Sequence, residues 1–334
     1  MSKPKITVAI SSYNNRNYIG ACLQCVVNQT LEDIEIICID DCSTDGSLLV
    51  LQEYSKSDSR IRLIKKEKNE GLAVLRNNAV RYAKGKYILF LDGDDLYDFD
   101  LCRKVYECAE LNGSDMVLWD YLCFVDESEI LEKTMIKSRL QSVLPDDKLA
   151  LLQRPAFIWT RLLKLEVFKS LHIEFPKGLT RQDIPVHWQL ITQLNKISIL
   201  PERLCYYRQQ PNATTHQKDS RLFDLVRVMD IVAEYLQKSN LYQKYQNEFF
   251  RQQFNLLHGM VDSIDSRFRE EALNLICQRI EGDQLHYLKS KNHLRWQAKL
   301  FYNSILGSRI SGLLYHLWLF TRWNYRLLNK GRFF

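Results

Sequence analysis

Tyr87-Ile88-Leu89-Phe90-Leu91-Asp92-Gly93-Asp94-Asp95 is the stretch of sequence that decides the fold of this chain. Five consecutive apolar residues bounded by a turn signal predict a buried strand, so the three carboxylates follow at the point where that strand leaves its sheet. Like charges this close together repel one another unless a cation lies between them. Taken alone, the stretch leaves two interpretations open, a divalent-metal site and a solvated acidic turn, because Asp and Gly are ordinary turn residues.

The first 120 residues alternate short apolar runs with helix-like segments. The predicted strands are 6–10, 34–39, 61–64, 86–91 and 116–119. Repeated strand, helix, strand units predict an α/β fold with a mainly parallel sheet covered by helices on both faces. Ligands bind beyond the carboxyl ends of such strands, so residues 11–14, the acidic pair Asp40-Asp41 and residues 92–95 are expected to converge there.

The composition is that of a globular protein of 334 residues, 46% of them hydrophobic. The nine cysteines are odd in number and mostly fall on apolar faces, which indicates core residues in a reducing compartment. Cys22 and Cys25 form a CxxC inside an apparent helix with no second pair, so a metal or redox role is disfavoured. Residues 1–5 lead directly into a strand without an apolar signal region, so the catalytic part is expected in the cytoplasm.

The end of the chain is strongly basic and aromatic. From residue 289 onward there are nine Lys or Arg residues and no Asp or Glu, and half of the six tryptophans of the protein. The uncharged run 310–321 is too short to cross a bilayer. A basic, aromatic amphipathic helix instead indicates attachment to an anionic membrane surface, and the alternative is a basic helix packed on the protein's own body or on a partner chain. No recognised RNA or DNA module accompanies the charge, so no nucleic-acid partner is expected.

Six short motifs follow one another in the first 95 residues. They are Ile10-Ser11-Ser12-Tyr13-Asn14, Val27-Asn28-Gln29-Thr30, Ile39-Asp40-Asp41-Cys42-Ser43-Thr44-Asp45-Gly46-Ser47, Asn69-Glu70-Gly71, Ala73-Val74-Leu75-Arg76-Asn77 and Leu91-Asp92-Gly93-Asp94-Asp95. In this order they resemble the family 2 glycosyltransferases of the GT-A fold, from the first strand through the DxD motif. Cys42 departs from the pattern, because the family usually has Gly or a small polar residue there.

The resemblance implies a nucleotide-sugar donor, with a UDP-sugar as the leading candidate. Its base and ribose would lie near Ser11, Tyr13 and Asp40, and Arg76 is similar to the basic residue that approaches the nucleotide. Packing at a strand end is the alternative for Tyr13, and a helix-surface cation is the alternative for Arg76.

The same resemblance gives roles to the acidic turn. Asp92 would lie near the ribose, with Gly93 beside it in the donor site. Asp94 would contact Mn²⁺ or Mg²⁺ bound to the diphosphate, and Asp95 would be an additional metal partner. Hard oxygen ligands of this kind suit both ions.

The catalytic base is expected at Gln182-Asp183, which resembles the acidic pair that precedes a helix in this family. Gln182 replaces the usual Glu, so Asp183 is the carboxylate left to act as base. The alternative is a first-turn Asp favoured by the helix dipole. A single base with direct attack on the anomeric carbon implies inversion of configuration.

Two further stretches resemble parts of the acceptor or diphosphate sites. Trp159-Thr160-Arg161-Leu162 is similar to a Trp-Asn-Lys-Leu pattern whose tryptophan could stack on an acceptor sugar, and burial in the core is the alternative. Tyr207-Arg208 is similar to a segment that folds over the diphosphate, and a structural ion pair of Arg208 is the alternative. His187 has no partner at metal-ligand spacing.

These observations predict an inverting, metal-dependent glycosyltransferase of bacterial surface-polysaccharide synthesis. The expected parts are a GT-A domain over 1–217, with a nucleotide-sugar half over about 1–120 and an acceptor half over about 121–217, and a helical region over 218–334. Its acceptor would be a saccharide or a lipid-linked precursor, and its place the inner face of the cell membrane. A nucleotidyltransferase and a catalytically idle membrane-bound scaffold remain as alternatives, and the donor sugar, the linkage and the oligomeric state stay open.

Overall fold

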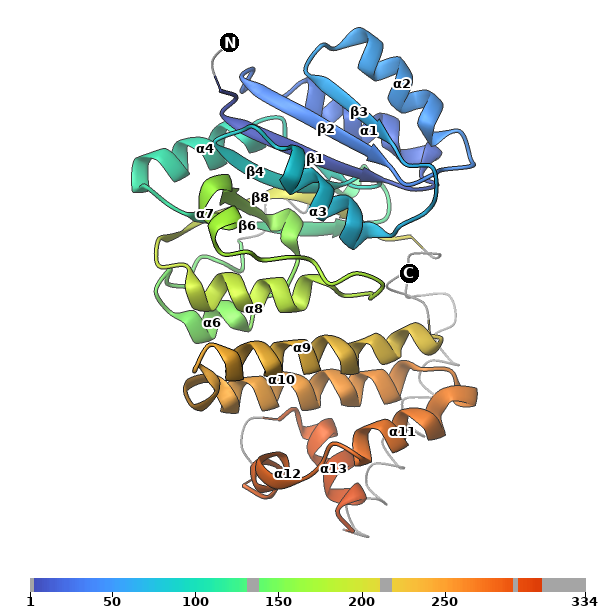
Figure 1. The fold of residues 1–334 in the computed structure, drawn as a ribbon, viewed down its shortest axis with the longest axis vertical. Helices are drawn as coiled ribbons and strands as arrows, with labels where there is room; N and C mark the ends of the chain where they lie inside the picture. The colour runs from blue at the N-terminus through green and yellow to red at the C-terminus, as the bar shows by residue number, and fades with distance from the viewer. Residues whose placement is uncertain (1–2, 131–137, 211–217, 291–293, 308–334) are drawn as a thin grey trace. The chain divides into compact units, whose positions relative to one another are not determined.

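The structure is a computed structural model that describes residues 3–130, 138–210, 218–290 and 294–307. The chain separates into two compact units, Met1–Pro211 and Asn212–Phe334 (Figure 1). The boundary predicted after residue 217 falls at the end of the segment 211–217, which lies outside the described residues.

Eight strands form a single sheet in the first unit. Their bounds are β1 Ile6–Ser12, β2 Ile34–Asp40, β3 Ile61–Lys65, β4 Tyr87–Asp92, β5 Leu96–Tyr97, β6 Met116–Phe124, β7 Arg161–Lys164 and β8 Ile197–Arg208. The spatial order is β3-β2-β1-β4-β7-β6-β8-β5. The strands β3, β2, β1 and β4 are parallel, as predicted. The sheet as a whole is mixed, because β7 is antiparallel to β4 and β6, and β5 is antiparallel to β8.

The helices of this unit connect the strands. Their bounds are α1 Arg16–Val27, α2 Ser47–Ser57, α3 Leu72–Tyr82, α4 Leu101–Asn112, α6 Lys148–Leu152, α7 Leu165–Ser170 and α8 Asp183–Gln193, with a short 3₁₀ turn, η1 Ile158–Thr160. Gly113 ends α4 with a φ of 59°, a left-handed conformation that glycine adopts without a steric penalty.

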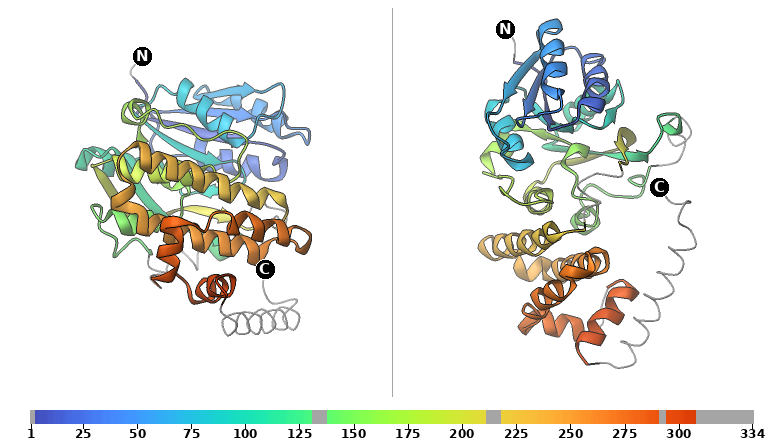
Figure 2. Two further views of the ribbon diagram at one scale, coloured as in Figure 1. Left: turned by 60° about the horizontal axis from the view of Figure 1, so that its bottom comes forward. Right: turned by 90° about the vertical axis from the view of Figure 1, so that its right-hand side faces the viewer.

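The strand β4 is buried on both faces within the helix-flanked sheet (Figure 2), which explains its unbroken apolar run. Leu89 and Leu91 belong to one core together with buried residues of α1, α2 and α4. Phe90 points to the other face, where its ring centroid lies 6.5 Å from that of Phe168 and 5.5 Å from that of Phe175. Alternation of apolar and polar residues is therefore absent from this strand.

The strand predicted at 116–119 is longer in the structure, where β6 spans Met116–Phe124. Its pairing with β8 shifts register on both sides of Asp120. This aspartate interrupts the apolar run and is buried, and its carboxylate accepts hydrogen bonds from Ser138 Oγ at 2.9 Å and from the Arg139 amide at 2.7 Å. Because a buried polar residue at a bulge interrupts the apolar run, the sequence pattern did not predict the second half of the strand.

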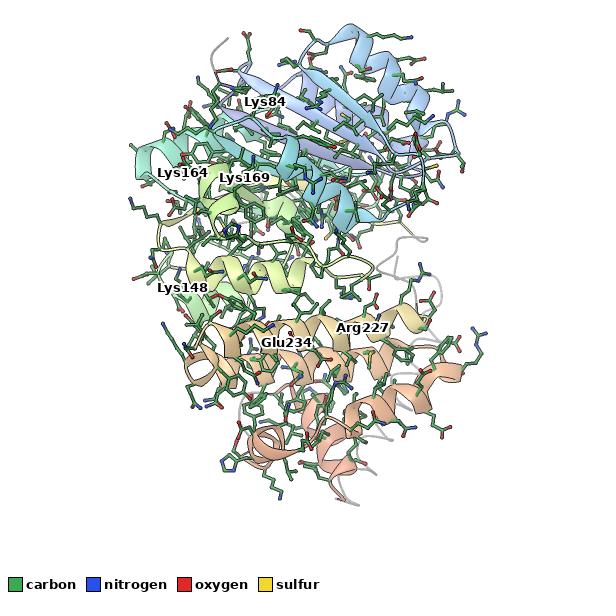
Figure 3. The ribbon with its side chains drawn as sticks, in the orientation of Figure 1. Lys84, Lys148, Lys164, Lys169, Arg227 and Glu234 are labelled. Atoms are coloured by element: carbon green, nitrogen blue, oxygen red, sulfur yellow. The ribbon has the colours of Figure 1, made fainter. Side chains whose placement is uncertain are left out.

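Lys84 and Lys164 lie at the amino-terminal edge of the sheet. Lys84, Lys164 and Lys169 are labelled in Figure 3, and Lys164 pairs with Tyr87, the first residue of β4. Lys84 also belongs to this amino-terminal edge, since its amide donates to Glu35 in β2. The acidic residues that end β2 and β4 lie at the opposite, carboxyl-terminal edge.

The second unit is helical. Its elements are η3 Ser220–Phe223, α9 Asp224–Lys238, α10 Tyr242–Ser263, η4 Ser266–Phe268, α11 Arg269–Cys277, α12 Gly282–Lys289 and α13 Trp296–Ile305. The predicted apolar stripe is confirmed as buried; it consists of Leu222, Leu225, Val226, Met229, Val232 and Leu236. The described part of the basic, aromatic segment packs within this unit, because Phe301 and Tyr302 of α13 are buried and the Tyr302 hydroxyl donates to Phe254 O at 2.9 Å.

That part of the tail therefore follows the alternative interpretation, a helix packed on the protein's own body. The remainder, 308–334, lies outside the described residues. Among the helices that the structure describes, none has the length and apolar character needed to span a bilayer.

Candidate active site

The ends of three neighbouring strands bring the predicted donor residues together. In the pairing of β1 with β2, Ser12 is opposite Asp40, and in the pairing of β1 with β4, Ser11 is opposite Asp92. The predicted convergence of these segments at one edge of the sheet is confirmed. Asp40 and Asp92 close their strands, so the backbone of the sheet fixes where both carboxylates start.

Asp40 is buried and only half satisfied. Its Oδ2 accepts a hydrogen bond from the Ser43 amide at 3.0 Å, and among the described residues Oδ1 has no partner. A buried carboxylate oxygen without a donor is costly, so this oxygen is suited to an incoming N–H group. Tyr13 stands beside this edge with 51% of its surface exposed, which excludes simple core packing for its ring.

The loop after β2 follows an unusual backbone path. Cys42 has a φ of 62° and Asn14 a φ of 47°, both in the left-handed region. The two loops are tied together, since the Asn14 amide donates to Ser43 Oγ at 3.0 Å and Asn14 Oδ1 accepts from the Thr44 amide at 2.8 Å. The left-handed conformation explains the glycine expected in place of Cys42.

Asp41 gives a physical reason for the Asn69-Glu70-Gly71 motif. Its two oxygens accept hydrogen bonds from the amides of Glu70 and Gly71, both at 2.8 Å. Gly71 precedes α3 with a φ of 84°, so this carboxylate fixes the start of the helix that carries Arg76. The sequence places Asp41 beside Asp40 but gives it no role of its own. The Asn69-Glu70-Gly71 motif was the signal that could have revealed its hydrogen bonds.

Gly93 is required by the close approach of neighbouring groups. A Cβ atom at this position would lie 2.5 Å from Asn15 Nδ2, 2.8 Å from Ile19 Cδ1 and 3.0 Å from Ser11 O. The Gly93 amide donates to Ser11 O at 3.1 Å, and the Tyr97 hydroxyl donates to Asp92 O at 3.0 Å. The acidic turn is thus held against β1 by its own backbone.

Asp94 and Asp95 contact Arg208, the last residue of β8, and Gln210, which follows the strand. Asp95 Oδ1 accepts from the Arg208 amide at 2.8 Å, Asp94 O accepts from Arg208 Nε at 3.0 Å, and Asp94 Oδ2 accepts from Gln210 Nε2 at 3.0 Å. Arg208 also pairs with Glu127 at 3.0 Å, so the structural ion pair exists, and its guanidinium lies over the rings of Tyr18 and Phe124. No sequence signal pointed to Gln210.

The electrostatics of this turn favour a cation. Burial and the neighbouring Asp92 raise the pKa of Asp94 to about 6, and burial together with Asp94 raises the pKa of Asp95 well above its usual value. Asp95 Oδ2 has no hydrogen-bond partner among the described residues. Carboxylates with these raised pKa values fit a divalent ion, which would lower the cost of their charges.

The protein offers few ligands for such an ion. Within the described ranges, no three His, Cys, Asp or Glu side chains gather into a site that could hold a metal. Asp94 and Asp95 would therefore hold it as a pair, with the other positions left to water and phosphate oxygens, as is usual for Mg²⁺ at phosphate sites.

Arg76 connects Asp92, at the carboxyl-terminal edge of the sheet, to Asp183, the predicted base. It is only 2% exposed. Its Nη2 donates to Asp92 Oδ1 at 3.0 Å, and its Nη1 donates to Asp183 Oδ1. Burial acts to lower the pKa of Arg76, but Asp183 and Asp92 outweigh it and raise that pKa. The alternative of a helix-surface cation is excluded by this burial, whereas a contact with the nucleotide stays a prediction.

Asp183 begins α8 and is 15% exposed at its side chain. Its Oδ2 accepts a hydrogen bond from the Ile158 amide at 3.3 Å. Burial raises the pKa of Asp183, while the charge of Arg76 opposes that rise. Gln182 is buried beside it; with its amide oxygen turned toward Arg76, it accepts from Nη1 at 3.2 Å and donates to Leu179 O at 3.1 Å.

Trp159 lies within a cluster of aromatic side chains. Its ring stacks on Phe157 at 4.8 Å between centroids and contacts Tyr121 at 5.1 Å and Tyr207 at 5.5 Å. Because Trp159 is only 3% exposed, its own ring is core, whereas the rings of Phe157, Tyr121 and Tyr207 around it are partly exposed. The core interpretation of Trp159 is the one that its burial supports.

The sequence of the first unit matches a known protein family and known bacterial proteins. Residues 7–171 match the family described as Glycosyl transferase family 2. The chain is 31% identical over 216 residues to the putative teichuronic acid biosynthesis glycosyltransferase TuaG of Bacillus subtilis, covering 65% of this chain and 83% of TuaG. It is 28% identical over 271 residues to the putative glycosyltransferase EpsH of the same organism, covering 78% of this chain and 77% of EpsH.

The fold also matches a solved structure. The crystal structure of Staphylococcus aureus TarS 1-349 in complex with UDP-GlcNAc has a TM-score of 0.59 at 18% sequence identity, and the match covers 90% of this chain and 92% of that chain. At this level of identity the likeness is one of fold, a GT-A sheet flanked by helices.

Proposed function

The chain belongs to the family 2 glycosyltransferases, and from that premise we propose that it moves a sugar, with inversion, from a UDP-sugar to a hydroxyl of a saccharide or lipid-linked acceptor. The observation that carries this proposal is the pair of ion pairs made by Arg76. One side chain links Asp92, at the donor edge of the sheet, to Asp183, at the start of α8. Donor activation and proton removal would then occur at one place, as glycosyl transfer requires.

Asp183 is proposed as the general base. It would accept the proton of the acceptor hydroxyl while that oxygen forms a bond to the anomeric carbon and the bond to the UDP oxygen breaks. Arg76 and the Ile158 amide would hold the carboxylate in place, leaving part of it exposed toward the acceptor. Attack opposite to the leaving UDP inverts the anomeric configuration.

Asp94 and Asp95 are proposed to hold Mn²⁺ or Mg²⁺ together with the diphosphate. A bound divalent ion neutralises charge that develops on a leaving diphosphate. Arg208, held against the same turn, would add a positive charge close to the phosphates. The unpaired Asp40 Oδ1 and the exposed Tyr13 ring are proposed to contact the base, with Ser11 and Gly93 lining the donor edge.

The donor and acceptor classes rest on two kinds of support. A UDP-sugar suits the unpaired Asp40 oxygen, which would accept an N–H of a pyrimidine base, and the fold neighbour TarS was crystallised with UDP-GlcNAc. A saccharide acceptor of bacterial surface polysaccharide follows the names of the relatives, among them teichuronic acid biosynthesis. The partly exposed rings around Trp159 would give a sugar an apolar surface to stack on.

The donor proposal is tested by thermal unfolding of wild type and Asp94→Ala with a panel of nucleotide sugars, with and without Mn²⁺. A ligand that binds only the folded state raises the melting temperature. Wild type should be stabilised by a UDP-sugar only with the metal, and Asp94→Ala should lose that stabilisation. Equal stabilisation of both proteins would remove Asp94 from the donor site.

Product analysis separates the two alternative functions. Transfer releases UDP and gives a glycoside whose anomeric configuration, read by NMR, is opposite to that of the donor. A nucleotidyltransferase would release pyrophosphate instead, and an idle scaffold would form no product with any acceptor.

Membrane attachment is proposed only for the segment 308–334, on its sequence. It carries Arg309, Arg322, Arg326, Lys330 and Arg332 without an acidic residue. Each cation near an anionic surface contributes about 1 kcal/mol. Full-length protein should sediment with anionic liposomes and less with neutral ones, and Arg322→Glu with Arg326→Glu should reduce the bound fraction. Unchanged sedimentation of that double variant would refute the proposal.

A further inference from the structure

Arg161, the first residue of β7, is a fully buried cation without a carboxylate in contact. Its Nη1 donates to Phe157 O at 2.8 Å, and its Nη2 donates to Pro155 O at 3.2 Å and to His187 Nδ1 at 2.7 Å. Within the described ranges it forms no ion pair, and burial lowers its pKa to about 10. A buried charge of this kind is costly, so its position calls for a role.

His187 forms hydrogen bonds both to Arg161 and to Leu152, the last residue of α6. A guanidinium can only donate hydrogen bonds, so His187 Nδ1 must be the acceptor and the ring is neutral. The proton then lies on Nε2, which donates to Leu152 O at 3.2 Å. Burial and the Arg161 charge both lower the pKa of His187, which agrees with a neutral ring.

The hydrogen bonds of Arg161 support Asp183 from two sides, through His187 on α8 and through the peptide between Phe157 and Ile158. His187 follows Asp183 by one helical turn on α8, so the two side chains share a face of the helix. On the other side, Arg161 binds the carbonyl of Phe157, and the next amide, that of Ile158, donates to Asp183 Oδ2. The guanidinium therefore holds both the helix that carries the carboxylate and the peptide that binds it.

We propose that Arg161 and His187 are positioning residues for Asp183: they fix the carboxylate between α8 and η1. This inference rests on the proposed role of Asp183 as base. The charged and titratable groups facing Asp183 are Arg76 on α3, Asp92 on β4 and Arg161 on β7. Arg161 is the one of these that contacts no carboxylate, so its charge can be removed without breaking an ion pair.

The test compares the pH dependence of kcat for three variants. Arg161→Met should lower kcat on the order of tenfold to a hundredfold, because small displacements of a catalytic group have effects of that size. It should also move the acid limb of the profile to higher pH, since a lost positive charge makes Asp183 easier to protonate. Arg161→Lys keeps the charge and should leave the limb near its wild-type position. His187→Leu keeps the charge but removes the link, so it should lower kcat without moving the limb.

Ile191→Ala is the matched control, because Ile191 is buried on the same helix and contacts none of these groups through a hydrogen bond. It should lower stability and leave the acid limb in place. Donor affinity, measured as the binding of the UDP-sugar with Mn²⁺, should stay within about twofold of wild type in every folded variant, because the donor residues are untouched.

A wild-type kcat and acid limb in Arg161→Met would overturn the inference. If that variant does not fold, wild-type kcat in His187→Leu overturns it instead. Near-normal turnover of Asp183→Asn would refute the proposed base itself, and so distinguishes failure of the proposed function from failure of the positioning role.

Discussion

The ionised carboxylate of Asp94 destabilises the fold of the metal-free protein, because it is buried beside Asp92. Its pKa rises from 3.8 to about 6 through burial and the charge of Asp92. Between these two pH values the folded state binds more protons than the unfolded state, so the free energy of unfolding falls as the pH rises. Above about pH 6 the full cost of the buried charge is present.

Asp94→Asn should therefore raise the melting temperature of the metal-free protein at pH 7.5 and have little effect at pH 4. The amide oxygen can still accept from Gln210, so the hydrogen bond is kept. The measurement is thermal unfolding at the two pH values, and Asp146→Asn, at an exposed aspartate, is the control. A lower melting temperature of Asp94→Asn at pH 7.5 would show that the charge is already compensated in the metal-free protein.

Substitution by alanine should have opposite effects on the unfolding free energy at Gly93 and at Gly259. Gly93→Ala places a methyl group against Asn15, Ile19 and Ser11 O, and should cost about 1–3 kcal/mol of unfolding free energy through overpacking. Gly259 lies inside α10, and among the described residues a Cβ atom there would meet nothing within 4 Å apart from its chain neighbours and the backbone of its own helix, so Gly259→Ala should add about 0.5–1 kcal/mol to the unfolding free energy. Urea denaturation measures both, and equal signs would contradict the packing described for Gly93.

At the scale of elements, the sequence predicts what local patterns encode. The apolar runs of β1, β2 and β4 and the stripe of α9 are buried as expected, because an unbroken apolar run predicts a strand covered on both faces and the stripe recurs with the period of a helix. The antiparallel strands β5 and β7 are short and have no such pattern, so their place in the sheet depends on contacts distant in sequence. The sequence also did not predict the second half of β6, because the bulge at Asp120 interrupts the apolar pattern.

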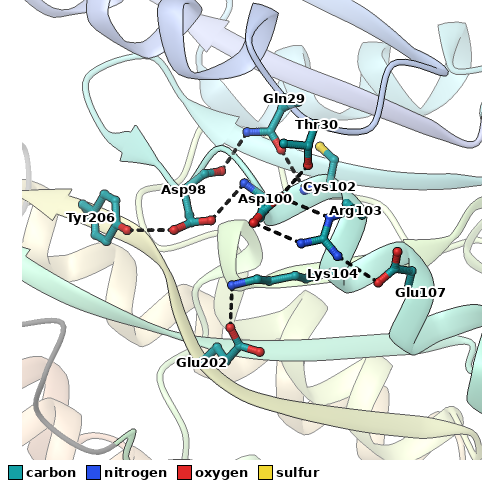
Figure 4. A network of polar contacts seen from close by, with 10 residues as sticks. All are labelled: Gln29, Thr30, Asp98, Asp100, Cys102, Arg103, Lys104, Glu107, Glu202 and Tyr206. Carbon is teal, nitrogen blue, oxygen red and sulfur yellow. Dashed lines mark hydrogen bonds and ion pairs between the residues drawn. The ribbon is translucent and has the colours of Figure 1, made fainter.

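A network between α1, the start of α4 and β8 explains another motif (Figure 4). Gln29 Nε2 donates to Asp98 O at 2.8 Å and to Cys25 O at 3.1 Å, while its Oε1 accepts from the Cys102 amide at 2.8 Å. Asp98 Oδ2 accepts from the Tyr206 hydroxyl at 3.2 Å. The Gln of Val27-Asn28-Gln29-Thr30 thus fixes the segment that follows the acidic turn.

Gln29→Glu keeps the shape of the side chain and removes its two N–H donors. Leaving these carbonyls without donors should cost about 1–3 kcal/mol of unfolding free energy per unsatisfied group. The KM for the donor should rise as well, because the segment after Asp95 loses its support. Thr30→Ala, which removes only the hydrogen bond to Asp100, is the milder control. Equal stability of Gln29→Glu and wild type would show that the network does not hold this segment.

At the scale of the whole molecule, the family and the order of the parts followed from motifs, whereas the connections between them did not. Asp40, Asp92 and Asp183 could be named from the sequence because each stands in a motif. The bridge by Arg76 and the support by Arg161 and His187 could not, because they join α3, β7 and α8 across the fold. The sequence alone does not tell whether an arginine faces solvent or, like Arg76, two carboxylates.

In the proposed mechanism, Asp183 removes the proton of the acceptor while the donor is held at the other end of the Arg76 bridge. Removing a general base commonly lowers the rate about a hundred- to ten-thousandfold. The most direct test is the kcat of Asp183→Asn, measured beside its affinity for the UDP-sugar with Mn²⁺. If Asp183 is the base, the kcat of Asp183→Asn should fall about a hundred- to ten-thousandfold, and its affinity for the UDP-sugar should be retained. A kcat close to that of wild type would contradict it.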